Sequence, residues 1–308
     1  MKIGILLPIA ETDQGAQLRY TEIRESALQL ERDGFDALWI VDHLLFQWND
    51  DPPRGIWEGW TLLAALAEAT TRIELGTLVM CTAFRNPALL AKMADAVDEV
   101  SDGRLTLGLG AGWHEPEFTA FGYPYDHLAS RFEDALRIIA PLVRTGAVDY
   151  QGTYEQAVNA VSRPRGPRPA GPPLLIGAGR PRMLRLTAEI ADAWNTCWLG
   201  RAGELPERVA PMHAACDEMG RDPGTLELTV GQIATFPGLW QASDFADGAE
   251  RFEFATPAAL AAEWRAYEQQ GVGHLIVWPT PFDAQCVDSV TAALRAYRAG
   301  DYRAGDDA

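Results

Sequence analysis

Short apolar runs, rich in β-branched and aromatic residues, recur along the whole chain. Most of them are continuous rather than alternating, which is typical of strands that are covered on both faces. The pattern predicts eight strands, at residues 3–9, 37–41, 73–80, 105–109, 174–176, 193–196, 226–234 and 274–278.

The segments between these runs carry apolar residues at helical spacing, and several open with a proline. Eight strands that alternate with eight helices predict a (β/α)8 TIM barrel, which would form one domain over residues 1–308. An open doubly wound sheet is the alternative. The predicted helices lie at residues 20–32, 60–69, 87–100, 131–144, 181–190, 206–219, 257–270 and 286–299.

Two stretches interrupt this alternation. Residues 145–172 are dense in Pro, Gly and Arg, and residues 237–255 are acidic and aromatic. We expect both to be long inserted loops, which are more often functional than decorative. Together with the polar loop at 44–57, they would determine the substrate.

Chemically useful residues follow six of the predicted strands. Because the carboxyl ends of the strands of a barrel meet on one face, this convergence predicts a ligand site there. The residues are Asp42 and His43, Cys81 and Thr82, Gly110 to Glu115, Gly177 to Arg180, Asn195 with Cys197 and Trp198, and Trp278 with Thr280.

Two glycine clusters have different expected roles. Gly108, Gly110 and Gly112 alternate, so a flat ligand could lie against bare backbone, or the strand could pack closely on a helix. Gly177-Ala178-Gly179 precedes a predicted helix that starts near Arg180, Arg182 and Arg185. A helix amino terminus with these cations suits a phosphate.

The composition narrows the function further. A net charge of −17 and a pI of about 4.7 argue against nucleic acids and anionic membranes as partners. Four scattered cysteines and five dispersed histidines give neither a disulfide framework nor metal-ligand spacing, so we expect no metal and a cytoplasmic location. The short apolar amino terminus is interpreted as a strand rather than a secretion signal.

Several stretches in order resemble the luciferase-like monooxygenase superfamily, and within it the oxidoreductases that depend on coenzyme F420, a deazaflavin. The likeness covers essentially residues 1–200. It rests on residues 27–39 with Asp42 and His43, and on residues 58–63, 69–77, 86–92, 101–104, 108–113, 117–118, 172–177 and 191–195.

This resemblance implies a TIM barrel with the cofactor ring at the carboxyl ends of the strands. A non-prolyl cis peptide behind the ring would fall at Leu78-Val79. His43 would act as acid/base, with Asp42 orienting it, since imidazole changes charge near neutral pH. The residues expected to bind the cofactor are Asp42, Leu78, Val79, Cys81, Gly110, Ala111, Gly112, Trp113, Gly177, Ala178, Gly179 and Arg180.

Relatives that oxidise sugar phosphates carry a glutamate where this chain has Trp113, which puts that substrate in doubt. Glu115 or Glu58 could replace it as the second proton-handling group. We expect Glu58, Glu115, Trp48 and Trp57 to approach a small-molecule substrate.

Hydride transfer between the deazaflavin C5 and a small organic substrate is therefore the predicted reaction. Two alternatives remain: a two-component monooxygenase that uses reduced FMN and oxygen, and a non-catalytic member that only binds a cofactor. Relatives often form homodimers, but the apolar stripe at Trp60, Leu62, Leu63 and Leu66 is better explained by core packing.

Overall fold

The computed structural model of the chain describes residues 1–12, 15–48, 51–240 and 251–300. Eight parallel strands form a closed barrel, in the order β10-β11-β12-β13-β1-β2-β5-β7, and β7 pairs back with β10. This closure confirms the TIM barrel and excludes the open sheet. The barrel strands are β1 (Lys2–Leu6), β2 (Ala37–Ile40), β5 (Glu74–Thr77), β7 (Leu105–Gly110), β10 (Leu174–Gly177), β11 (Ala193–Leu199), β12 (Glu227–Ala234) and β13 (His274–Pro279).

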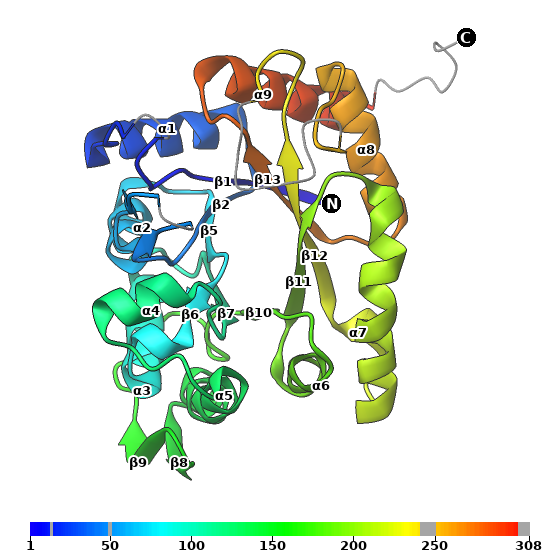
Figure 1. Ribbon diagram of the computed structural model, residues 1–308. Helices are drawn as coiled ribbons and strands as arrows, with labels where there is room; N and C mark the ends of the chain where they lie inside the picture. Colours follow the sequence, from blue (N-terminus) through cyan, green and yellow to red (C-terminus); the bar gives the residue numbers. More distant parts are fainter. Residues whose placement is uncertain (13–14, 49–50, 241–250, 301–308) are drawn as a thin grey trace.

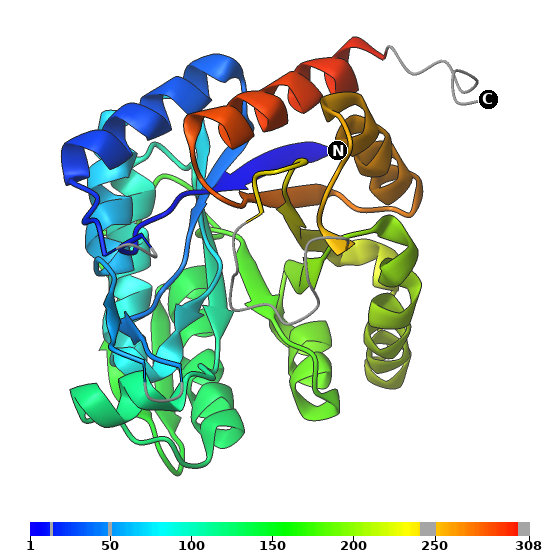
Figure 2. The ribbon, with the colours of Figure 1, turned by 45° about the horizontal axis from the view of Figure 1, so that its top comes forward.

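Helices surround these strands on the outside, as Figures 1 and 2 show. They are α1 (Tyr20–Asp33), α2 (Gly59–Ala69), α3 (Pro87–Val100), α5 (Leu128–Thr145), α6 (Pro181–Ile190), α7 (Leu205–Met219), α8 (Pro257–Gln269) and α9 (Ala284–Ala299). Each matches a predicted helix to within about three residues. The apolar stripe of α2 (Trp60, Leu62, Leu63 and Leu66) is buried in the core of a single chain, as expected.

Large apolar side chains fill the inside of the barrel. Trp39 of β2 lies across it, and a Cβ at Gly4 or Gly76 would come within 2.6 or 2.3 Å of its indole. Trp39 Nε1 donates to His274 Nε2 of β13 at 3.3 Å. Side chains therefore fill the interior of the barrel. This leaves the carboxyl ends of the strands for a ligand.

The connections differ from the sequence-based expectation. Residues 145–172 are not a plain loop, because β8 (Ala147–Gln151) and β9 (Gln156–Val161) pair as an antiparallel hairpin beside α5 (Figure 1). The loop at 44–57 contains the small pair β3 (Leu45–Phe46) and β4 (Arg54–Gly55). A short helix, α4 (Glu115–Phe121), follows β7 and was not predicted.

The third barrel strand also differs, because β5 ends at Thr77 and a separate β6 (Met80–Cys81) follows it. Much of the expected insertion at 237–255 lies outside the described residues.

Candidate functional site

A cavity of about 1600 Å³ opens at the carboxyl ends of the barrel strands. It lies where the sequence places the ligand site, and most of the predicted strand-end and cofactor-binding residues line it. These are Asp42, His43, Leu78, Val79, Cys81, Gly112, Trp113, Gly177, Ala178, Gly179, Asn195, Cys197, Trp198, Trp278 and Thr280.

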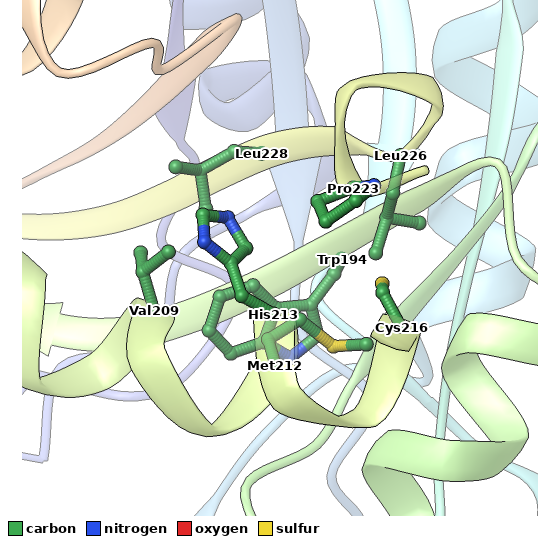
Figure 3. A pocket seen from close by; sticks show the side chains of 8 residues that line it. All are labelled: Trp194, Val209, Met212, His213, Cys216, Pro223, Leu226 and Leu228. Atoms are coloured by element: carbon green, nitrogen blue, oxygen red, sulfur yellow. The ribbon is translucent and has the colours of Figure 1, made fainter. Parts of the chain in front are cut away.

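A second, much smaller pocket lies elsewhere (Figure 3). It lies between α7 and the beginnings of β11 and β12, around His213, Cys216 and Trp194. Its volume of about 20 Å³ would hold one water molecule. The chemistry therefore belongs to the large cavity.

Asp42 binds an arginine rather than the neighbouring histidine. Its buried carboxylate accepts two hydrogen bonds from Arg85, at 2.7 and 2.9 Å, and one from the Cys81 backbone N–H at 2.9 Å. Burial raises the pKa of Asp42, and the Arg85 guanidinium opposes that shift. The expectation that Asp42 orients His43 is wrong, because Asp42 instead ties the end of β2 to the segment after β6.

His43 is oriented by Glu117 of α4. Its Nδ1 lies 2.9 Å from Glu117 Oε1, and Glu117 Oε2 accepts from the Leu44 backbone N–H at 2.7 Å. Because a carboxylate can only accept, His43 Nδ1 carries the proton of that hydrogen bond. His43 Nε2 has no hydrogen bond to any described residue, and the ring lines the cavity. The pair can therefore hold a proton and exchange it with a ligand.

Aromatic rings cover this pair from the side of the 44–57 loop. Trp48 stacks on Trp113 with ring centroids 5.6 Å apart, and Phe46 lies 4.6 Å from the His43 ring. His114 is buried beside them and accepts from the Gln47 backbone N–H at 3.1 Å. These rings shield one side of the imidazole, while its other side faces the cavity.

The Leu78–Val79 peptide is cis, as the resemblance implies, and both residues line the cavity. The glycines of β7 make room for this segment. A Cβ at Gly108 would lie 1.9 Å from the Thr77 carbonyl oxygen, and one at Gly110 would lie 2.5 Å from a Val79 methyl group.

The bare face of β7 is therefore filled by the neighbouring strand segment rather than by a ligand or a helix. Gly110 and Ala111, which were expected to bind the cofactor, lie outside the cavity lining that the described residues form. A second non-prolyl cis peptide, Cys197–Trp198, was not predicted and lies in the same cavity.

The phosphate loop is only partly as expected. Gly177 to Gly179 line the cavity, and α6 starts behind them without a side-chain cap from any described residue. Arg182, however, pairs with Glu133 at 2.5 Å, and Arg185 with Glu218 at 3.4 Å, so both are turned towards neighbouring helices. Arg180 is exposed at the start of α6, outside the cavity lining.

Three residues expected to approach the substrate have other surroundings. Glu58 caps α2 by accepting from the Trp60 and Thr61 backbone N–H groups, and it also pairs with Arg85. Trp57 donates to the Leu18 carbonyl oxygen at 2.7 Å. Glu115 is exposed at the start of α4. All three lie outside the described lining of the cavity, whereas Trp48 belongs to it.

The cavity also contains two thiols. Burial raises the pKa of Cys81 to about 12 and that of Cys197 to about 11, so both stay protonated near neutral pH. Cys197 opens onto the cavity although it lies deep in the molecule. Thiolate chemistry is therefore not supported.

Within the described residues, the structure contains no cluster of three or more His, Cys, Asp or Glu side chains suited to a metal. Searched over the same part of the chain, the helices include none that is long and apolar enough to span a membrane.

Sequence reasoning did not assign roles to Glu117 and Arg85. Glu117 stands in the first turn of a short helix directly after the glycine-rich strand, and residues 117–118 belong to the stretches that carry the family resemblance, but neither signal gave it a role. Arg85 could have been sought as the counter-charge that a buried Asp42 requires. Neither contact can be predicted from the local sequence, because 74 residues separate His43 from Glu117 and 43 residues separate Asp42 from Arg85.

Comparison with known proteins identifies the family. A sequence model described as luciferase-like monooxygenase matches residues 1–238. The chain is 33% identical over 226 residues to the pyrimidine monooxygenase RutA of Methylobacterium radiotolerans, a match that covers 69% of this chain and 58% of that protein. It is 28% identical over 205 residues to an F420-dependent glucose-6-phosphate dehydrogenase of Amycolatopsis mediterranei, covering 65% of this chain and 60% of the relative.

A solved structure shares the fold along its whole length. An F420-dependent secondary alcohol dehydrogenase in complex with an F420-acetone adduct superposes with a TM-score of 0.78 at 18% identity, covering 96% of this chain and 99% of that one. The closed barrel and the match over residues 1–238 lead to one conclusion. The chain belongs to the luciferase-like monooxygenase family.

Proposed function

We propose that the chain is an F420-dependent oxidoreductase that catalyses hydride transfer between the deazaflavin C5 and a small organic substrate. The observation that carries this proposal is the His43–Glu117 pair. Glu117 holds Nδ1 of the His43 ring, and this ring lines the cavity. Its other nitrogen, Nε2, has no hydrogen bond to a described residue. A hydride transfer to or from a carbonyl or alcohol needs such a group to exchange the accompanying proton.

The residues around the cavity fit a ring with an anionic tail. Leu78 and Val79 offer an apolar surface for the ring. From Gly177 to Gly179 the lining runs to the start of α6, where free backbone N–H groups and the helix dipole favour an anion. A Cβ at Gly179 would meet no described atom within 4 Å, so a ligand can approach the backbone there.

When bound, the deazaflavin donates or accepts the hydride at its C5 carbon. His43 Nε2 donates or accepts the proton at the substrate oxygen, and Glu117 stabilises the imidazolium that forms when His43 holds both protons. The stacked pair of Trp48 and Trp113 covers one side of the ring that makes this transfer. Asp42 acts only through position, because its pairing with Arg85 fixes the backbone from which His43 projects.

A monooxygenase that uses reduced FMN and oxygen is the second candidate. The relative that supports it is the pyrimidine monooxygenase, which is more similar in sequence than the F420-dependent dehydrogenase, at 33% against 28% identity. The same cavity and helix start would accept FMN, which also combines a ring with an anionic tail.

The assigned roles are tested by His43→Gln and Glu117→Gln. We expect turnover of F420 with the best substrate from a panel of alcohols, carbonyls and alkenes to fall about 10²- to 10⁴-fold for His43→Gln. Glu117→Gln should lower it by a smaller factor, because the amide keeps the shape but not the charge.

The matched controls are His213→Gln, on the outer helix α7, and Glu115→Gln, exposed on the same helix as Glu117. Both should turn over F420 as the unaltered chain does. Full turnover by His43→Gln would contradict the role given to the imidazole.

A further inference from the structure

Arg208 is a cation in the wall of the cavity that has no partner among the described residues. It lies in the first turn of α7, directly after the β11 connection, and it lines the same cavity as Gly177 to Gly179. With the residues that the structure describes it forms neither a hydrogen bond nor an ion pair. Its charge lies close enough to the Cys197 thiol to act against the raised pKa of that group.

Other arginines near the cavity, in contrast, do have acidic partners. Arg182 and Arg185 of α6 pair with Glu133 and Glu218, although they are no more buried than Arg208. In a chain with a net charge of −17, a guanidinium that faces a cavity without an acidic partner is suited to an anionic ligand.

The wall that α1 and the start of α9 form carries more carboxylates than cations, although Arg32 of α1 also lines it. Several carboxylates line it from α1 and from the start of α9: Glu22, Glu25, Asp283 and Asp288. His43 stands between the two walls along the barrel order, after β2. A ligand that carries several negative charges would therefore extend over the β10 and β11 side.

A buried polar atom on that side also has no partner among the described atoms. Asn195 of β11 is 2% exposed and lies in register with Gly177 of β10. Its Nδ2 donates to Thr229 Oγ1 at 2.8 Å, and Thr229 Oγ1 donates to the Trp194 carbonyl oxygen, so the amide orientation is fixed. Asn195 Oδ1 then remains an acceptor without a partner among the described atoms, in a residue that lines the cavity.

We propose that Arg208 is a specificity-determining residue that binds an anionic group of the cofactor beyond its ring, either the phosphodiester or the carboxylates of the F420 tail. Asn195 Oδ1 accepts a hydroxyl of the sugar-alcohol chain that leads from the ring to that tail. This inference rests on the proposed F420 dependence. An anionic substrate could offer the same chemistry, and the experiment below separates the two sources.

The test measures binding without any substrate, by quenching of ligand fluorescence. The probes are F420 and its truncated form FO, which ends before the phosphate. Charge-assisted hydrogen bonds of this kind correspond to a change of about 10- to 100-fold in Kd. We expect Arg208→Gln to weaken F420 binding by that factor and to leave the Kd of FO within about twofold, with Arg208→Lys falling between. Arg24→Gln, which removes an exposed arginine of α1 outside the cavity lining, should change neither Kd.

Unchanged F420 binding by Arg208→Gln would overturn the inference, and a raised KM for an anionic substrate alone would assign the arginine to the substrate instead. Equal weakening of F420 and FO would reveal a merely structural role and would also overturn it. Failure of the unaltered chain to bind F420 would reject the proposed function itself, and with it the inference. The binding data therefore distinguish failure of this inference from failure of the proposed function.

Discussion

At the scale of single residues, two neighbours in sequence have separate partners. The Asp42 carboxylate binds Arg85, and His43 binds Glu117, so one residue fixes the backbone and the other presents a proton-exchanging ring. The sequence shows that Asp42 and His43 are neighbours, but not that they bind different partners, because both partners come from distant parts of the chain. Only the fold decides which acid faces the imidazole.

Another histidine, His274, has a purely structural role that pH can reveal. It is buried inside the barrel and accepts the indole N–H of Trp39, and burial lowers its pKa to about 3. The unfolded chain, in contrast, binds a proton at this residue below about pH 6.5. The stability that His274 contributes is therefore complete above about pH 6.5 and is lost as the pH falls towards 3.

Urea unfolding at pH 7 and pH 5 measures this loss. One proton taken up only on unfolding changes the free energy of unfolding by about 1.4 kcal/mol per pH unit. We expect the unaltered chain to lose about 2 kcal/mol more than His274→Gln between these values, since the glutamine can accept from Trp39 but does not titrate. Equal losses in the two proteins would contradict a neutral buried His274.

At the scale of elements, the segment from β5 to β6 and the strand β7 form one packed unit. Thr77 Oγ1 donates to the Gly108 carbonyl oxygen and accepts from the Gly108 N–H, both at 2.9 Å. Val79 fits against Gly110 and Gly177. The alternating glycines therefore shape the surface that carries Leu78 and Val79, instead of contacting a ligand themselves.

Gly108→Ala tests this packing. Its Cβ would lie 1.9 Å from a backbone carbonyl oxygen, which cannot move aside as a flexible side chain can. We expect a loss of about 1 to 3 kcal/mol or more in the free energy of unfolding. Gly203→Ala is the matched control, because no described atom lies within 4 Å of its Cβ, and it should stay within about 0.5 kcal/mol. Equal stability of the two variants would mean that β7 does not pack as described.

At the scale of the whole molecule, hydrophobic periodicity predicted the barrel and the location of its cavity. Strands buried on both faces and helices opened by proline leave a strong local signal, as at Pro87 of α3 and Pro181 of α6. The hairpin β8–β9 leaves a weak one, because most of its side chains are exposed and its register depends on pairing with itself.

The short helix α4 has only seven residues, too few for periodicity to register, and yet it supplies Glu117. The part of the site that depends on such contacts could not be read from the sequence. The strand ends, in contrast, could be predicted, because the topology of a parallel barrel alone brings them together.

The most direct test of this account is equilibrium binding of the two cofactors to the purified chain, with F420 and FMN titrated separately under identical conditions. We predict that F420 binds with a Kd at least tenfold below that of FMN, and that substrate reduces or reoxidises the bound deazaflavin. Tight binding of FMN without binding of F420 would contradict the account and favour the flavin monooxygenase.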